Sequence, residues 1–307
     1  MQVFTSLDDI RIDEKTSVAL GNFDGVHIGH AEIFKQALKT AKEGGLKSLC
    51  YTFSNHPFNY IMGRDESEPE ALKLIMSEED KIATIEEYGF DYLVNVPFDE
   101  ITMKMSADTF LNDIVLSKLN AQAVSVGFNY TYGARAMGTS ATLTEECKSR
   151  GMIVSVHDAV MIDDRVVSST MIREEIARGN MELVSELLGC DYSYSGIAVH
   201  GKTIGRENGV PTINIDIPAN RAVPPYGVYA ATIYVDGQAY DGIVNIGNQP
   251  TFGRNEMKLE AHLFDYDDNA YDKSIRVCLK KFIRPERKFD SKDALYAQIK
   301  MDCEAVR

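Results

Sequence analysis

Residues 16–45 read TSVALGNFDGVHIGHAEIFKQALKTAKEGG, and this stretch decides the fold of the first part of the chain. Ser17–Leu20 predicts a buried strand, because a strand covered on both faces carries apolar side chains at successive positions. The glycine-containing turn that follows leads into a helix that ends at Gly44-Gly45. A strand, a turn and a helix in this order begin a βαβ unit. The positions expected on the buried helix face are Ile33, Phe34, Leu38 and Ala41.

The same alternation of apolar runs and helical periodicity continues to about residue 188. Strands that alternate with helices build a parallel sheet. We therefore predict a doubly wound α/β domain over residues 1–188, with its ligands bound at the carboxyl ends of the strands. The further strands expected in it are 49–53, 92–96 and 123–127, and the further helices are 107–119, 181–187 and one capped by Ser77.

The pattern changes near residues 188–196 to short strands roughly 10 residues apart, which is typical of an all-β barrel or sandwich. The clearest pair is 229–235 and 238–246, because the Asp236-Gly237 between them suits a type I′ hairpin turn. The whole chain is thus expected to be α/β followed by β. The other elements expected in the small β-barrel domain, residues 189–307, are a strand at 274–282 and a C-terminal helix at 291–305.

Composition narrows the class of protein. The chain has 307 residues, of which 44% are hydrophobic and 25% are charged, so an ordinary globular protein of about two domains is expected. With 32 Lys and Arg against 46 Asp and Glu, the net charge is −14. This charge disfavours binding to nucleic acid or to an anionic membrane. Phosphate groups must therefore be bound locally, by backbone amides, helix N-termini, single cations and a divalent metal.

Two further features concern the compartment. No run approaches 18 apolar residues and the N-terminus has no apolar signal segment, so neither a membrane span nor a secretory signal is expected. Five scattered cysteines without a CxxC pair fit a reducing cytoplasm better than a disulfide framework or a zinc site. We expect a cytoplasmic protein that is a monomer or a weak homo-oligomer.

The turn at residues 21–30, GNFDGVHIGH, carries the sharpest chemical signal. Its glycines allow a close backbone approach to a phosphate, and two imidazoles at a helix N-terminus can donate hydrogen bonds to charge on a transferring phosphoryl group. A tight turn with one buried core histidine is the alternative for an isolated HxGH. The strand before it and the helix after it favour the phosphoryl-transfer interpretation.

This turn resembles the nucleotidyltransferase signature GxFDGxHxGH of the bacterial bifunctional riboflavin kinase/FMN adenylyltransferases, also called FAD synthetases. Three more segments are similar to that family in the same order. They are TFSNHP at 52–57, with Asn55 where the family has proline, GFNYTYG at 127–133, and SSTMIR at 168–173. The resemblance implies a nucleotidyltransferase-like first domain.

The second part resembles the riboflavin kinase half of the same family. Its similar segments are GRENGVPTIN at 205–214, NIGNQPTF at 245–252, EAHLFD at 260–265 and FIRPERKF at 282–289. The chain departs from the family at LGCDY, residues 188–192, and at Glu207, Asn208 and Val210. A carboxylate at Glu207 beside a phosphate loop should weaken ATP binding by repulsion.

The resemblance implies a role for each matching residue. His27 and His30 would stabilise the α-phosphorus during adenylylation of FMN, Arg173 would hold the departing pyrophosphate, and Glu260 would be the base that activates riboflavin. Thr212 and Asn214 would bind Mg²⁺, because both offer hard oxygen ligands. The implied nucleotide contacts are Gly21, Phe23, Asp24, Gly25, Gly29, Asn129, Ser168, Ser169, Thr170, Gly205 and Gly209. The implied flavin contacts are Phe53, His56, Pro57, Tyr130 and Arg284.

The expected function is therefore synthesis of FMN and then FAD from riboflavin, with ATP as substrate and Mg²⁺ as cofactor. An adenylyltransferase whose kinase half is inactive is the nearest alternative, suggested by Glu207, Val210 and the altered segment at 188–192. A non-catalytic flavin or nucleotide sensor is a third. The presence of His27, His30, Arg173 and Glu260 argues against the sensor.

Overall fold

The computed structural model describes residues 1–199, 212–251, 254–266 and 268–306. Within this part of the chain the residues separate into two compact units, Met1–Ser169 and Thr170–Arg307. None of the helices described there combines the length and the apolar character needed to span a bilayer.

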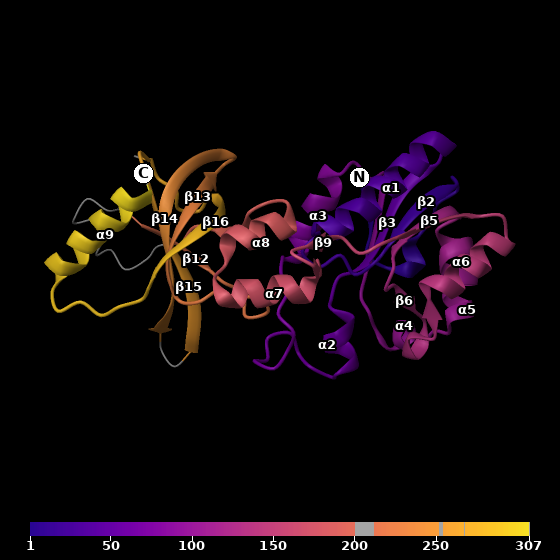
Figure 1. Ribbon diagram of the computed structural model, residues 1–307, viewed down its shortest axis with the longest axis horizontal. Helices are drawn as coiled ribbons and strands as arrows, with labels where there is room; N and C mark the ends of the chain where they lie inside the picture. Colours follow the sequence, from indigo (N-terminus) through magenta and orange to yellow (C-terminus); the bar gives the residue numbers. More distant parts are fainter. Residues whose placement is uncertain (200–211, 252–253, 267, 307) are drawn as a thin grey trace. The chain divides into compact units, whose positions relative to one another are not determined.

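The first unit is built on a six-stranded, fully parallel sheet with strand order β1-β4-β3-β2-β5-β8 (Figure 1). The strand that precedes the histidine turn, β2, is buried along its whole length, as the apolar run in the sequence predicted. The strands are β1 (Gln2–Phe4), β2 (Thr16–Leu20), β3 (Lys47–Phe53), β4 (Tyr92–Val96), β5 (Ala121–Gly127) and β8 (Ile153–His157).

Each face of this sheet has its own hydrophobic core. Neighbouring residues of one strand fall into different cores: Val18 and Leu20 of β2 belong to one, and Ala19 belongs to the other. Phe34, from the helix after the histidine turn, packs in the same core as Ala19. Because both faces are covered, the predicted doubly wound architecture is confirmed.

The helix that follows the histidine turn, α1 (Ile28–Gly44), begins and ends where the sequence predicted. His27 is its N-cap, and Gly45 closes it in the left-handed conformation with φ 61°. The other helices and short hairpin strands of this unit are η1 (Leu7–Asp9), α2 (Pro57–Ile61), α3 (Glu78–Glu87), α4 (Glu100–Lys104), α5 (Ala107–Thr109), η2 (Phe110–Lys118), β6 (Thr131–Tyr132), η3 (Ala134–Ala136), β7 (Gly138–Thr139), α6 (Ser140–Ser149), β9 (Met161–Ile162) and β10 (Arg165–Val166).

One predicted helix differs in its hydrogen bonding. The sequence predicts an α-helix at 107–119, whereas only α5 is α-helical and the nine residues of η2 form a π-helix. The amide of Leu119 accordingly donates to the carbonyl of Ile114, five residues earlier, at 2.9 Å. The buried side chains of η2 recur about every four residues, a spacing compatible with either ladder. Hydrophobic periodicity therefore did not distinguish the two.

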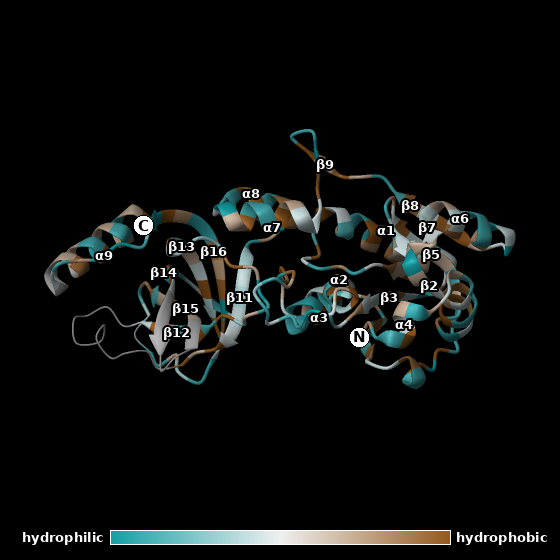
Figure 2. Cartoon of the chain, turned by 90° about the horizontal axis from the view of Figure 1, so that it is seen from below, coloured by the Kyte–Doolittle hydropathy of each residue, from teal (hydrophilic) through white to brown (hydrophobic). Residues whose placement is uncertain are grey.

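The second unit contains an antiparallel six-stranded sheet in the order β11-β16-β13-β14-β15-β12. An isolated bridge between Val199, two residues past the end of β11, and Asn214 of β12 brings the two ends of this order together and nearly closes the sheet into a barrel. Figure 2 shows brown and teal residues side by side on α7 and α8, as expected of amphipathic helices. The elements are α7 (Ser169–Arg178), α8 (Met181–Leu188), β11 (Tyr192–Ile197), β12 (Ile213–Asp216), β13 (Gly227–Val235), β14 (Gln238–Thr251), β15 (Arg254–Leu263), β16 (Ser274–Pro285) and α9 (Lys292–Val306).

The hairpin and the C-terminal helix of this unit agree with the sequence. Between β13 and β14, Asp236 and Gly237 have φ 49° and 84°, as a type I′ turn requires. Ile299 and Val306 of α9 pack against a small core that contains Val228 and Phe264. The predicted β-barrel with a C-terminal helix is thus confirmed.

Candidate active sites

His27 occupies the N-cap of α1 and is almost fully buried, with 6% of its surface exposed. Its Nδ1 accepts a hydrogen bond from the backbone amide of His30 at 3.3 Å. An Nδ1 that accepts leaves the proton of the neutral ring on Nε2. Burial lowers the pKa of His27 to about 4, because the charged imidazolium loses its hydration. At neutral pH this residue is therefore a neutral hydrogen-bond donor.

The ring of His30 stacks on that of His27, with 3.6 Å between centroids and 19° between planes. Burial lowers the pKa of His30 well below its ordinary value, and a positive charge on His27 would lower it further. Its Nδ1 is buried without a hydrogen-bond partner in the part of the chain that the structure describes. A buried ring nitrogen without a partner is costly in a folded protein, and it is a reason to expect a ligand or water here.

The turn that carries the two histidines is tight and strained. Phe23 and Val26 have φ 51° and 39°, a region that a β-branched residue such as valine adopts only under constraint. Gly21 lies so close to the Phe23 ring that a Cβ there would come within 2.6 Å of it. Strain of this kind persists where the surroundings hold the backbone, and it is common at functional sites.

A cavity of about 920 Å³ opens at the carboxyl ends of β2, β3 and β5, and its wall includes His30. This is the edge at which doubly wound sheets bind ligands, and the volume suits a large organic molecule. The predicted site residues that line this cavity are Gly21, Phe23, His30, Phe53, His56, Pro57, Asn129 and Tyr130. The structure thus brings together residues from three separate sequence motifs.

Other predicted residues of the first motif lie beneath this wall. The carboxylate of Asp24 is buried and accepts a hydrogen bond from the amide of Ile75 at 3.0 Å. The carbonyl of Asp24 accepts a hydrogen bond from the hydroxyl of Ser169 at 2.9 Å. Gly25 takes φ 86°, and a Cβ on Gly29 would come within 3.1 Å of the His27 ring. These residues therefore restrain the conformation of the turn that carries the histidines.

The SSTMIR segment falls on the division between the two units. Ser168 and Ser169 end the first unit, whereas Thr170 and Arg173 belong to the second, on α7. The nucleotide role predicted for this segment stays a prediction.

In the second unit, the predicted kinase residues meet on neighbouring strands. The hydroxyl of Thr212 donates to the carboxylate of Glu260 at 2.6 Å. Asn214 of β12 is paired directly with Glu260 of β15, which is paired in turn with Asn245 of β14. Directly opposed residues present their side chains on the same face of a sheet. Thr212, Asn214 and Glu260 therefore form one cluster, whereas Gly205 and Gly209 lie outside the described residues.

The donor set of this cluster fits Mg²⁺. Thr212 uses its hydroxyl proton toward Glu260, which leaves the lone pairs of its oxygen available to a cation. Asn214 is 2% exposed, and its amide oxygen is the atom of this side chain that can bind a cation. Magnesium prefers oxygen ligands and commonly uses one or two protein groups together with waters and substrate phosphates. Thr212 and Asn214 are suited to hold it.

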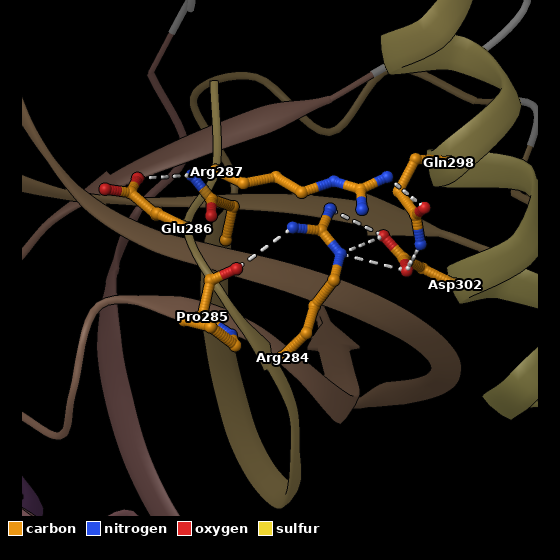
Figure 3. Close-up of polar contacts among 7 residues, drawn as sticks. Arg284, Pro285, Glu286, Arg287, Gln298 and Asp302 are labelled. Atoms are coloured by element: carbon orange, nitrogen blue, oxygen red, sulfur yellow. Dashed lines mark hydrogen bonds and ion pairs between the residues drawn. The ribbon is translucent and has the colours of Figure 1, made fainter. Parts of the chain in front are cut away.

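Arg284, predicted as a flavin contact, is engaged with the C-terminal helix (Figure 3). Its guanidinium donates to both carboxylate oxygens of Asp302, with distances of 2.7–3.0 Å. Gln298 donates to the same carboxylate at 2.7 Å. Asp302 is 3% exposed, so this is a largely buried ion pair. The position of Arg284 supports a role in fastening α9, and its flavin contact stays a prediction.

Comparison with known proteins agrees with this geometry. Residues 9–171 match the family model described as FAD synthetase, and residues 188–307 match the model described as riboflavin kinase. The bifunctional riboflavin kinase/FMN adenylyltransferase of Bacillus subtilis is 37% identical over 95% of this chain and 92% of its own length. That of Haemophilus influenzae is 33% identical over 100% and 98%. The chain belongs to the bifunctional riboflavin kinase/FMN adenylyltransferase family.

The crystal structure of a Streptococcus pneumoniae protein described as a macrolide-efflux protein has the same fold over the whole length. It superposes with a TM-score of 0.88 and 28% identity, covering 99% of this chain and 97% of that one. The description as an efflux protein belongs to that protein alone. The predicted domain boundary between residues 188 and 189 stays a prediction. The two compact units of the structure meet at Ser169, and the two family models leave residues 172–187 unmatched between them.

The cavity also contains residues that sequence reasoning missed. Among the described residues no Asp or Glu lines it, although the chain is strongly acidic, whereas Lys104 and Arg135 do. Lys104 pairs with Glu100 on α4 at 2.5 Å. Arg135 lies on η3 in a left-handed conformation, φ 57°, and makes no ion pair or hydrogen bond with other described residues. Two cationic side chains in the wall favour an anionic ligand. Neither Lys104 nor Arg135 belongs to a sequence motif, so no signal in the sequence pointed to them.

Proposed function

We propose that the chain phosphorylates riboflavin to FMN on its barrel and adenylylates FMN to FAD at the cavity above its parallel sheet, with ATP as the donor in both steps. Membership of the family and the matches to both family models support the two reactions. The observation that supports placing adenylylation there is the stacked pair His27 and His30, the second of which lines a cavity without an Asp or Glu among its described lining residues.

In adenylylation, an oxygen of the FMN phosphate attacks the α-phosphorus of ATP, and the bond to pyrophosphate breaks. FMN is already an anion, so no strong base is needed, and the site must instead stabilise the charge that builds up. Neutral imidazoles do this by donating hydrogen bonds without a countercharge. We assign this task to His27 and His30, and we assign Arg173, Ser168, Ser169 and Thr170 to the departing pyrophosphate.

We place the flavin against the aromatic and apolar wall of the same cavity. The Phe53 ring packs edge-on against Tyr51 and Phe98, and Tyr130 stacks with Tyr132 at 5.9 Å. His56 caps α2 and Pro57 opens it, which fixes the part of the wall contributed by α2. A wall of rings and apolar side chains suits the flat ring system of a flavin.

Phosphorylation of riboflavin needs a base for the 5′-hydroxyl, which then attacks the γ-phosphorus and releases ADP. Glu260 is the carboxylate in the cluster with Thr212 and Asn214, and we assign it this role. When bound, Mg²⁺ would neutralise charge on the ATP phosphates. Thr212 would also orient Glu260 through its hydrogen bond.

We further propose a cytoplasmic location, because both reactions consume ATP and all five cysteines are free thiols, as a reducing compartment favours. The expectations of a monomer or weak homo-oligomer, and of no nucleic-acid partner, stay predictions.

The test is incubation of the chain with riboflavin, ATP and Mg²⁺, followed by chromatographic separation of the flavins. FMN and FAD together support the proposal. Conversion of added FMN without conversion of riboflavin supports the alternative, an adenylyltransferase with an inactive kinase half. If neither flavin is converted, the proposal is wrong.

Single variants test the assignment of residues. His30→Ala should slow FAD formation on the order of a hundredfold, as expected for loss of one donor to a developing negative charge, and leave FMN formation intact. Glu260→Ala should abolish FMN formation and spare adenylylation of added FMN. Equal loss of both activities in either variant would contradict two separate sites.

A further inference from the structure

Lys81 is a buried lysine that neither proposed site uses. It lies on α3, and only 8% of its surface is exposed. Its ammonium group donates to the backbone carbonyl of Phe53, the last residue of β3, at 2.5 Å. Burying an ammonium is costly unless charged or polar groups compensate. The groups around Lys81 must therefore compensate its buried charge.

The surroundings of Lys81 are acidic and belong to the first unit. Lys81, Asp24 and Glu78 line a small cavity of about 20 Å³ together with His56. Burial lowers the pKa of Lys81, while the charges of Asp24, Cys50, Glu78 and Glu66 act in the opposite direction, with Asp24 the largest of the four. Glu78 also accepts a hydrogen bond from Asn95, and Glu66 one from the amide of His56. Of these four groups, Asp24 acts most strongly on Lys81, and the two side chains line the same small cavity.

Asp24 lies in the middle of the strained turn that carries the two histidines. Its carboxylate binds the amide of Ile75, its carbonyl binds Ser169, and the neighbouring carbonyl of Asn22 binds the Thr52 hydroxyl at 2.8 Å. The turn needs such restraints because Phe23 and Val26 have positive φ. The ammonium group of Lys81 adds an electrostatic attraction to Asp24 that these hydrogen bonds do not supply.

We propose that Lys81 is a positioning residue for adenylylation of FMN: its ammonium fixes the end of β3 through the Phe53 carbonyl and holds the Asp24 turn that presents His27 and His30. The inference rests on the function proposed above. One side chain thereby links the flavin wall, to which the Phe53 ring belongs, with the turn that carries the imidazoles. Lys81 touches no substrate and acts through these two segments.

The experiment compares Lys81→Met, Asp24→Asn and the double variant Asp24→Asn/Lys81→Met in the full chain. Adenylylation of FMN is measured from pH 5.5 to 8.5, and riboflavin phosphorylation by the same preparations reports on the second unit. We expect Lys81→Met to lower kcat/KM for FMN at least tenfold at pH 7 with an unchanged kinase rate.

In the double variant the Asp24 carboxylate is gone as well, so the loss in kcat/KM should be smaller than the product of the two single losses. Lys39→Met, on the exposed face of α1, is the matched control and should behave as the wild type. Losses that simply multiply would overturn the proposal. So would a Lys81→Met variant that melts earlier but keeps its kcat/KM.

Removal of one buried charge can unfold the unit. If Lys81→Met does not fold, the double variant, which removes both charges, is used as the test instead. The proposal then requires the double variant to fold and to convert FMN, and an unfolded or inactive double variant overturns it. Absence of FAD formation by the wild-type chain would instead contradict the proposed function. The two failures are therefore distinguishable.

Discussion

At the scale of single residues, the histidine pair of the first unit is buried and uncharged at neutral pH. The His27–His30 stack would repel itself if both rings were charged, and burial removes that charge. The same burial links the stability of the unit to pH. A hydrogen-bond donor that carries no charge is also independent of pH across the neutral range, which suits a site that must work at constant rate in a cell.

The pKa of His27, about 4 in the folded chain against 6.5 ordinarily, gives a stability prediction. Between these values the unfolded state binds more protons, so the free energy of unfolding rises with pH there. The contribution of the neutral His27 to stability is fully present above about pH 6.5. It is lost as the pH falls toward 4, which lowers the free energy of unfolding by an amount on the order of 3 kcal/mol. Calorimetric scans between pH 4.5 and 7.5 would measure it.

His27→Asn is the control for this measurement, because asparagine is a good N-cap and does not titrate. The variant should show a shallower slope of unfolding temperature against pH, and His30 should account for part of what is left. An unchanged slope would mean that His27 is not buried in its neutral form.

Arg135 carries a prediction about specificity. Its guanidinium, without an ion pair among the described residues, lines a cavity that has no carboxylate. FMN and riboflavin differ only by the phosphate, so Arg135→Gln should raise the Kd for FMN about tenfold, as expected for loss of one charged hydrogen bond, and leave the Kd for riboflavin at the same site unchanged. Equilibrium titration of a His30→Ala background with each flavin measures this. Equal weakening of both flavins would place Arg135 against the ring instead.

At the scale of elements, sequence motifs located the ends of β2, β3 and β5 correctly, because glycine, proline and capping residues mark those turns locally. They did not reveal Lys81, Lys104 or Arg135, since each reaches its site through tertiary packing and none belongs to a motif. Arg284 shows the same limit. Its motif predicts a flavin contact, but its partner Asp302 lies 18 residues further along, and no local pattern encodes that pairing.

The C-terminal helix α9 depends on this ion pair. Asp302 is 3% exposed, and it accepts hydrogen bonds from Arg284 and Gln298. Asp302→Ala leaves a largely buried guanidinium without its countercharge, which should destabilise the second unit by about 3 kcal/mol. Thermal unfolding and the riboflavin kinase rate should both respond, while adenylylation of added FMN stays the same.

The control is Glu182→Ala, which removes an exposed ion pair with Lys281 in the same unit. Exposed pairs contribute little, so the change should stay within about 1 kcal/mol. If Asp302→Ala were no more destabilising than Glu182→Ala, then α9 would be held by its apolar contacts with Val228 and Phe264 alone.

At the scale of the whole molecule, two units with separate cores carry two different solutions to phosphate chemistry. In the function proposed above, one site uses neutral imidazoles at a cavity that no described carboxylate lines, and the other uses a carboxylate beside oxygen atoms that would bind a metal. The first needs no base because its nucleophile is already an anion, whereas the second must deprotonate an alcohol.

This division predicts that the two activities can be supplied by different molecules. His30→Ala should make FMN but little FAD from riboflavin, and Glu260→Ala should make neither. A mixture of the two variants with riboflavin, ATP and Mg²⁺ should form FAD after a lag, because FMN must leave one molecule and bind to another. The lag should shorten as the concentration of Glu260→Ala is raised. If the mixture forms no FAD while Glu260→Ala still converts added FMN, then FMN does not leave the molecule that makes it, and the two sites do not work independently.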